Sequence, residues 1–207
     1  GKNVALITDA GTPAISDPGE VLVQKCIEAG ITVTSLPGAS ACITALTLSG
    51  LSTRRFCFEG FLPPDKKERE EILAELAGET RTIVMYEAPH HLKKTLQELA
   101  DKLGDRKITL CRELTKKFET IIPTTINAAC EMYEEEDPRG EYVLVIAGLD
   151  KDIKKAEAIE NWNQIPLKEH MDKYLKNGME KKEAMKQVAA DRGISKRDVY
   201  NELLKDV

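Results

Sequence analysis

The chain of 207 residues carries a formal net charge of −5 and consists of 42% hydrophobic and 31% charged residues. This balance is typical of a globular protein with enough apolar material for a core, and the length favours one or two domains. No stretch approaches roughly 18 consecutive apolar residues, which excludes a membrane-spanning helix, and the acidic charge gives no general attraction to nucleic acid.

The charge is distributed unevenly along the chain. Residues 1–150 contain 17 Lys and Arg against 24 Asp and Glu, whereas residues 151–207 contain 13 against 11. An acidic body therefore carries a slightly basic tail.

The cysteines are scattered and show no C-x-x-C spacing: Cys26, Cys42, Cys57, Cys111 and Cys130. This pattern argues against a zinc site and against a disulfide framework. We therefore expect a protein of the reducing cytoplasm.

The first fifty residues predict two strands and two helices of an α/β protein, with parallel strands. Apolar, β-rich runs predict strands over 4–7 and 31–36, and a Gly/Pro/Asp-rich loop over 9–19 follows the first of them. The spacing of apolar residues predicts a helix over 20–29, and a run of small residues predicts another that ends near Ser49.

A second α/β set is predicted between residues 53 and 149. Strands are expected in four apolar runs, over 56–60, 82–86, 108–111 and 142–147. Helices are expected after the capping box Asp65-x-x-Glu68, from Pro89 to just before Gly104, and over about 125–133. The charged, aperiodic stretch 149–164 predicts a linker.

The tail changes in character and predicts three helices, over 167–176, 180–192 and 196–205. Ala189, Gly193 and Val199 have the spacing of a helix-turn-helix, in which the glycine forms the turn and the other two residues pack between helices. Lys196 and Arg197 would then stand at the start of the third helix, where they can contact phosphates. A helical hairpin without any role in nucleic-acid binding is the alternative.

The chain opens with Gly1-Lys2-Asn3 and enters a strand of the buried type at once. A parallel strand of this kind needs neighbours on both sides, and two strands are too few for a sheet. We therefore expect that natural N-terminal residues are missing. The expected domains are 1–52, a remnant of a first α/β lobe; 53–149, a second α/β lobe; and 150–207, a linker with a helical domain.

Two loops rich in small residues follow predicted strands. The first, DAGTPAISDPG (9–19), lies at the carboxyl end of a strand, where α/β folds bind small ligands, but it is neither a G-x-G-x-x-G fingerprint nor a P-loop. The second, LPGASA (36–41), repeats the arrangement, and small residues let the backbone approach a ligand closely. The alternatives are an ordinary turn-rich loop for the first and close helix packing for the second.

Ionisable side chains follow two further strands, in the stretches YEAPHH (86–91) and RELTKKFE (112–119). Four such stretches at one edge of a sheet favour a cleft over four separate solvated loops. His90 and His91 have no third ligand at a fitting spacing, so we expect no metal.

Six stretches, in this order, resemble the tetrapyrrole-methylase superfamily of S-adenosylmethionine-dependent methyltransferases. They are DAGTPAISDPG (9–19), LPGASA (36–41), FEGFLP (58–63), YEAPHHL (86–92), RELTKKFE (112–119) and GEYVLVIAG (140–148). The similarity is greatest to the branch that methylates the 2′-hydroxyl of a cytidine in 16S rRNA, in the decoding centre of the small ribosomal subunit.

The resemblance implies a two-lobed α/β methyltransferase that holds S-adenosylmethionine between its lobes, usually as a homodimer. The first lobe is incomplete here, and the all-helical C-terminal domain is helix-turn-helix-like and expected to bind RNA. Methyl transfer of this kind needs no metal, because the cofactor supplies the reactivity.

The resemblance also implies site residues. Those expected to bind the cofactor are Gly11, Thr12, Ile15, Ser16, Ala39, Ser40, Ala41, Met85, Tyr86 and Arg112. The candidate bases for the ribose proton are Glu87, Glu113 and Asp17, among which the sequence does not choose. The residues expected to contact RNA are Lys116, Lys196 and Arg197.

Two other functions stay open. A corrin-precursor methylase of the same superfamily would act on an anionic macrocycle, although the TPAISDPG form of the first loop, the YEAPHHL stretch and the basic tail favour RNA. A non-catalytic RNA-binding or scaffold protein is the second alternative, because an incomplete first lobe leaves a half-built cleft. Cofactor binding separates an enzyme from a scaffold, and binding of RNA or of tetrapyrrole separates the two enzymes.

Overall fold

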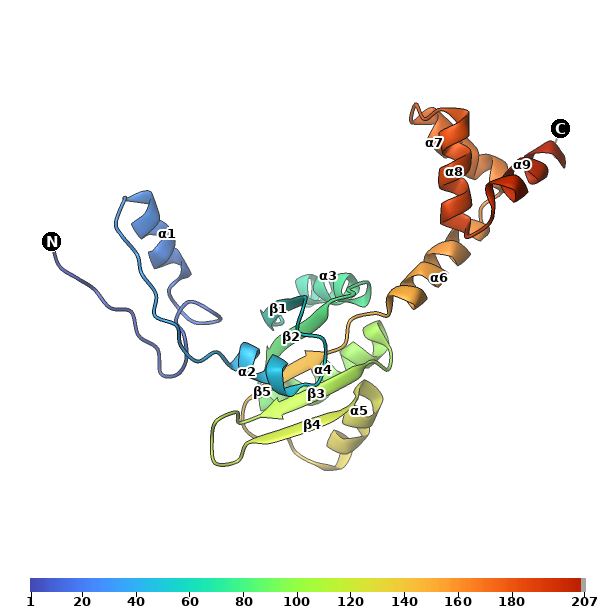
Figure 1. Ribbon diagram of the computed structural model, residues 1–207. Helices are drawn as coiled ribbons and strands as arrows, with labels where there is room; N and C mark the ends of the chain where they lie inside the picture. The colour runs from blue at the N-terminus through green and yellow to red at the C-terminus, as the bar shows by residue number, and fades with distance from the viewer. Residues whose placement is uncertain (206–207) are drawn as a thin grey trace. The chain divides into compact units, whose positions relative to one another are not determined.

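The computed structural model describes residues 1–205, apart from the side chains of Glu157 and Lys205 (Figure 1). The chain divides into two compact units, Gly1–Leu149 and a helical unit that begins at Asp150. Within the described range, every helix is too short or too polar to cross a bilayer.

A five-stranded sheet forms the centre of the first unit, in the order β1-β2-β5-β3-β4 (Figure 1). Its strands are β1 (Phe56–Phe61), β2 (Thr82–Glu87), β3 (Lys107–Arg112), β4 (Thr120–Thr125) and β5 (Tyr142–Ile146). Only β1 and β2 pair in parallel, and the other three pairs are antiparallel. The sheet is therefore mixed, with one parallel and three antiparallel pairs. The connection between β3 and β4, residues 113–119, is too short for the crossover that a parallel pair needs.

The strands β1, β2 and β3 nevertheless run in the same direction. Both β2 and β3 are antiparallel to β5, and β1 is parallel to β2. Their carboxyl ends therefore lie at one edge of the sheet. At this edge Glu87 of β2 and Arg112 of β3 both pair with Tyr142 of β5, from its two sides. The prediction of a shared edge is confirmed for the stretches after β2 and β3, 86–91 and 112–119.

Alternate residues of the strands face two different layers. Ile83 and Met85 belong to the larger core, which the sheet shares with α3 (Lys66–Ala77), α4 (Pro89–Leu103) and α5 (Ile126–Glu135). Val84, which lies between them, belongs to a second core with Ala45 of α2 (Ala41–Leu48). Three helices therefore cover one face of the sheet, and α2 packs on the other.

The sequence signals for helix ends in this unit are confirmed. The Asp65 carboxylate accepts a hydrogen bond from the backbone N–H of Glu68 at 2.9 Å, as the capping box predicts. Pro89 occupies the first turn of α4, and Gly104, at a φ of 71°, ends that helix.

Residues 1–40 contain one helix, α1 (Glu20–Glu28), and no strand. The strands expected over 4–7 and 31–36 are therefore absent, and Val4 and Leu36 are 86% and 87% exposed. Apolar, β-rich composition favours a strand only where neighbouring strands supply hydrogen bonds and cover both faces. No such neighbour pairs with these segments in the described structure.

The described part of the second unit, residues 150–205, contains helices and turns but no strand. Its helices are α6 (Lys151–Asn163), α7 (Leu167–Lys176), α8 (Lys181–Arg192) and α9 (Lys196–Lys205). The last three are confirmed, whereas the linker expected over 149–164 is wrong, because Asp150 caps a helix there. Gly193 forms the left-handed turn after α8, and Ala189 and Val199 are buried, as the helix-turn-helix spacing predicts.

Candidate functional site

The two loops rich in small residues are joined to each other. The backbone N–H of Thr12 donates a hydrogen bond to the carbonyl oxygen of Ala39 at 2.9 Å, and the Thr12 hydroxyl donates to the same oxygen at 3.0 Å. Two glycines permit this contact. A Cβ on Gly11 would lie 3.2 Å from the Ala39 oxygen, and one on Gly38 would lie 3.2 Å from Thr12 Oγ1. The loops 9–19 and 36–41 therefore form one continuous surface.

The first loop also touches the carboxyl end of β1. Gly60 has a φ of 61°, and a Cβ there would lie 3.0 Å from the hydroxyl oxygen of Ser16. The pairing of β1 with β2 shifts by one residue between Phe58 and Gly60. Such a bulge at a glycine bends a strand end and allows a close approach. It brings Ser16 to the end of the parallel strand pair.

Tyr86, near the carboxyl end of β2, connects the sheet to α2. Its hydroxyl oxygen accepts a hydrogen bond from the backbone N–H of Cys42, in the first turn of α2, at 3.2 Å. Phe58 and Phe61 pack edge-on against its ring, with centroids 5.0 and 5.5 Å away. Burial raises the pKa of Tyr86 above its usual value, so the hydroxyl keeps its proton at neutral pH. Tyr86, Phe58 and Phe61 therefore form an aromatic wall beside the second loop.

These contacts connect six of the residues expected to bind the cofactor: Gly11, Thr12, Ser16, Ala39, Ser40 and Tyr86. Ile15 and Ala41 are exposed on the same loops. Met85 is different. Its side chain is fully buried in the core under α3–α5, on the opposite face of the sheet from Tyr86. Any contact of Met85 with a ligand beside Tyr86 is therefore restricted to its backbone.

Arg112 also lies apart from the loops. Strand alternation places its side chain on the same face as Leu110, in the core under α3–α5, and away from α2. Its Nε is buried and has no hydrogen-bond partner among the described residues. A buried donor without an acceptor costs about 1–3 kcal/mol, so an acceptor on a ligand would be favourable there. The cofactor role of Arg112 stays a prediction.

Glu113 and Lys116 form an ion-pair network after β3. Glu113 Oε1 accepts hydrogen bonds from the backbone N–H of Glu141 at 2.9 Å and from the Lys116 ammonium at 3.0 Å. These two contacts lower the pKa of Glu113 below its usual value. The Lys116 ammonium also contacts the Glu141 carboxylate at 2.8 Å, and both carboxylates raise the pKa of Lys116.

Glu87 is buried and fully engaged. One carboxylate oxygen accepts from the backbone N–H of Ala88 at 2.8 Å, and the other accepts from the Thr95 hydroxyl at 2.5 Å. A guanidinium nitrogen of Arg69 lies 4.0 Å from the second oxygen, and Arg69 also pairs with Glu98 at 2.7 Å. This network joins the end of β2 to α3 and α4. It favours a structural role for Glu87 over that of a base.

The remaining expected site residues are exposed. Asp17 lies on the first loop, and Lys196 and Arg197 begin α9. The rings of His90 and His91 lie 4.2 Å apart. Within residues 1–205, no group of three or more His, Cys, Asp or Glu side chains is placed to hold a metal ion.

Sequence reasoning assigned no role to Phe58, Phe61 or Cys42. In a regular strand, residues three apart face opposite sides, so Phe58 and Phe61 would not share a partner. The bulge at Gly60 brings both rings against Tyr86. The available signal was Gly60 at the end of the predicted strand 56–60, because glycines in strands often mark bulges.

The sequence matches the model of the family Tetrapyrrole (Corrin/Porphyrin) Methylases over residues 1–130. That range contains both loops, Tyr86 and Arg112. Among solved structures, the methyltransferase CobJ is similar in fold, with a TM-score of 0.53 at 20% identity. The similarity covers 67% of this chain and 62% of the CobJ chain.

Two relatives match nearly the whole chain. Ribosomal RNA small subunit methyltransferase I of Halalkalibacterium halodurans is 43% identical over 201 residues, which cover 97% of this chain and 69% of the relative. The protein of the same name from Bacillus subtilis is 44% identical over 201 residues, which cover 97% of this chain and 68% of that relative. The chain belongs to the ribosomal RNA small subunit methyltransferase I family, within the tetrapyrrole (corrin/porphyrin) methylases.

Proposed function

We propose that this chain transfers a methyl group from S-adenosylmethionine to the ribose 2′-hydroxyl of a cytidine in 16S rRNA. The observation that carries the proposal is the identity of 43% and 44%, over 97% of the chain, to relatives named ribosomal RNA small subunit methyltransferase I. The cytidine and the ribose oxygen are proposed from the six motifs in the sequence. We place the reaction in the cytoplasm and the enzyme in a homodimer on the same ground.

The residue types at the edge of the sheet are suited to binding S-adenosylmethionine. Gly11 and Gly38 leave backbone groups uncovered where a Cβ would narrow the surface. Thr12, Ser16 and Ser40 offer hydroxyl groups for a ribose, and the aromatic wall around Tyr86 offers a surface for adenine. The bound cofactor supplies a methyl group activated by a sulfonium sulfur.

The protein's own residues have two tasks, to align the ribose oxygen and to accept its proton. A base needs a free lone pair and access to the ribose. Both oxygens of Glu87 are engaged in a buried network, and the contacts of Glu113 stabilise its ionised form, which weakens it as a proton acceptor. Asp17 is exposed on the loop that carries Thr12 and Ser16. These observations favour Asp17 as the base.

Three basic residues are proposed to contact the RNA phosphates. Lys116 lies after β3, with a side chain that is 49% exposed, and it would exchange one carboxylate partner for a phosphate. Lys196 and Arg197 are exposed at the start of α9. The corrin-precursor alternative is not favoured, because the likeness to CobJ at 20% identity supports a common fold alone.

Methyl transfer tests the proposal directly. The chain is incubated with S-adenosylmethionine that carries a tritiated methyl group, and with 16S rRNA either free or assembled in small subunits that lack the modification. We expect label in a dinucleotide that resists alkaline hydrolysis, because a methylated 2′-oxygen no longer attacks the neighbouring phosphate. Label in an alkali-labile nucleotide would contradict ribose methylation, and absence of label from both substrates would contradict the activity.

A further inference from the structure

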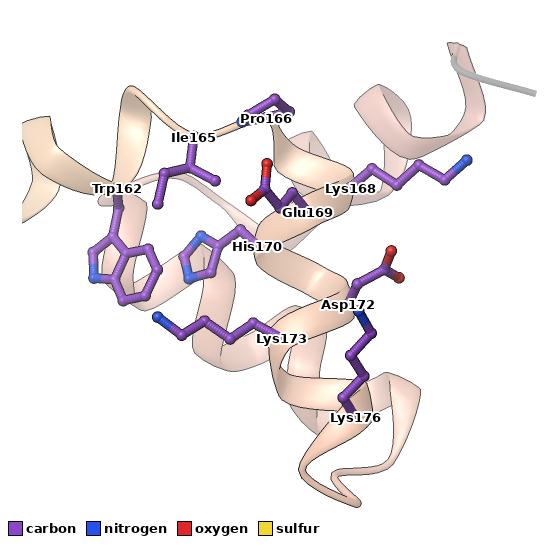
Figure 2. Close-up of a pocket in the computed structure, with 9 residues that line it drawn as sticks. All are labelled: Trp162, Ile165, Pro166, Lys168, Glu169, His170, Asp172, Lys173 and Lys176. Atoms are coloured by element: carbon purple, nitrogen blue, oxygen red, sulfur yellow. The ribbon is translucent and has the colours of Figure 1, made fainter.

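The second unit contains an aromatic stack that the proposed reaction does not use. The ring of Trp162, from α6, lies on the ring of His170, from α7, with centroids 3.8 Å apart and planes within 1° of parallel (Figure 2). His170 is fully buried, whereas Trp162 is half-buried. The tryptophan therefore keeps part of its surface open to solvent while its other contacts hold it in place.

The support beneath the tryptophan is rigid. Arg192 Nε donates a hydrogen bond to His170 Nδ1 at 3.1 Å. Because the guanidinium only donates, Nδ1 carries a lone pair, and the ring proton is on Nε2, which donates to Asp191 at 3.2 Å. The Tyr174 hydroxyl donates to the same carboxylate oxygen at 2.6 Å. These contacts fix the orientation of the imidazole on which Trp162 lies.

A surface cavity of about 590 Å³ opens beside this stack. Its lining, drawn in Figure 2, consists of Trp162, Ile165, Pro166, Lys168, Glu169, His170, Asp172, Lys173 and Lys176. The Lys173 ammonium reaches toward the two rings in this view and lies 4.9 Å from the centroid of Trp162. Among the described residues, none of the three lining lysines takes part in an ion pair. Their charges are therefore available to an anionic ligand.

The combination of groups identifies the ligand class. An aromatic face beside unpaired cations is the arrangement that proteins use to hold single-stranded nucleic acid, with a base on the ring and phosphates on the cations. The two lining carboxylates, Glu169 and Asp172, can accept hydrogen bonds from the amino groups of a base. Bases inside a duplex are already stacked, so the cavity fits an unpaired nucleotide.

We propose that this cavity binds an unpaired nucleotide of the RNA substrate, with its base against Trp162 and its phosphates beside Lys168, Lys173 and Lys176. The inference rests on the proposed function for its substrate. It adds an RNA contact on α6 and α7 that is separate from the one expected at Lys196 and Arg197.

The chain offers a direct probe, because Trp162 is its single tryptophan. A short single-stranded RNA of mixed sequence is titrated into the full chain. Tryptophan emission reports on the cavity, and the anisotropy of the same RNA carrying a fluorophore reports on binding anywhere. We expect saturable quenching with the same midpoint as the anisotropy change.

Variants separate the stacking contribution from the charge contribution. Trp162→Leu is expected to weaken binding about fivefold or more, and Trp162→Phe, which keeps a ring, to weaken it less. Replacing Lys168, Lys173 and Lys176 by Gln is expected to lower the slope of log K against log salt by about 2, since each phosphate contact with a single strand contributes about 0.7. The matched control replaces Lys181, Lys182 and Lys186 of α8, which are exposed and outside the cavity, and should keep most of the slope.

Two results would overturn the inference. One is RNA binding without quenching of Trp162, and the other is an equal loss of slope in both lysine triples. Either would place the RNA elsewhere and leave the proposed function standing, because methyl transfer to 16S rRNA is measured separately. Failure of the proposed function has another signature: quenching by RNA persists, but no methyl group reaches the ribose. Far-UV circular dichroism checks that each variant is folded.

Discussion

The hydroxyl of Tyr86 accepts a hydrogen bond from the backbone N–H of Cys42, which fixes the end of β2 to the first turn of α2. Cys42 is only 5% exposed, so water cannot easily replace the hydroxyl. The loop 36–41 runs directly into α2. Together with the hydrogen bonds from Thr12 to Ala39, this contact holds the loop over the edge of the sheet.

Tyr86→Phe removes this acceptor and keeps the ring. We expect the free energy of unfolding to fall by about 1–3 kcal/mol, because a buried N–H loses its partner. The affinity for S-adenosylmethionine should fall as well, by several-fold, because the loop is no longer held. Urea unfolding and calorimetry measure the two effects.

The control for this variant is Tyr133→Phe. The Tyr133 hydroxyl donates to the Tyr142 hydroxyl at 3.2 Å, inside the core under α3–α5 and away from α2. This variant should lose a comparable amount of stability but keep the cofactor affinity of the parent chain. Equal loss of affinity in both variants would mean that Tyr86 acts only through global stability.

Two of the three candidate bases, Glu87 and Asp17, can be separated by their amide variants. Glu87→Gln should lower the free energy of unfolding by about 1–3 kcal/mol, because it disturbs a buried network, and should leave methyl transfer by the folded enzyme largely intact. Asp17→Asn should leave stability unchanged and slow methyl transfer about 100-fold or more. A loss of activity in Glu87→Gln at unchanged stability would reverse the assignment.

Much of the first unit follows from its sequence. The capping box at Asp65, the proline at the start of α4 and the glycine after it each act through local geometry, and the structure contains all three. The four strands expected between residues 53 and 149 are also present. The strand β4 was not expected, because Pro123 interrupts its apolar run. A proline is tolerated there because β4 lies at the edge of the sheet.

The errors share a physical origin. Strands over 4–7 and 31–36 were expected from composition, but a strand needs partners that composition does not supply. The helix α6 was read as a linker because its apolar residues show no stripe, although Asp150 provides a cap. At the candidate site, the positions of the loops 9–19 and 36–41 in the chain could be predicted from the sequence. The burial of Glu87 could not, because it depends on Arg69, which comes from a helix eighteen residues earlier in the chain.

The stability of the second unit should depend on pH through His170. Burial, followed by the nearby Arg192, lowers the pKa of His170 below its usual value of 6.5. The imidazole therefore binds a proton more readily in the unfolded chain than in the folded unit. The folded unit has its full stability above pH 6.5, and its free energy of unfolding decreases as the pH falls through the pKa of His170 in the folded state. Unfolding by denaturant, followed by Trp162 emission, should have its midpoint at a lower denaturant concentration at pH 5 than at pH 7.5.

Two facts allow this pH dependence to be assigned to His170. The other two histidines, His90 and His91, belong to the first unit, and the single tryptophan belongs to the second. His170→Asn should flatten the dependence in this pH range, at some cost in stability at neutral pH. A midpoint that stays constant in the parent chain would show that the imidazole is not held neutral.

Removal of residues 150–207 should separate the two binding activities. Among the residues of that range that the structure describes, none belongs to either core of the first unit, so the sheet and the loops should persist. We expect unchanged affinity for S-adenosylmethionine, weaker RNA binding and a flatter salt dependence. If RNA affinity is the same at every salt concentration, the helical unit has no part in binding RNA.

Calorimetric titration of S-adenosylmethionine into the 207-residue chain and its Thr12→Arg variant tests the central claim most directly. Thr12 lies where the two loops meet, and its backbone and hydroxyl both contact Ala39. An arginine there should fill the surface and abolish binding. We predict saturable binding to the parent chain and none to the variant. Equal affinity in the two would contradict the placement of the cofactor at these loops, and binding to neither would contradict cofactor binding by this chain.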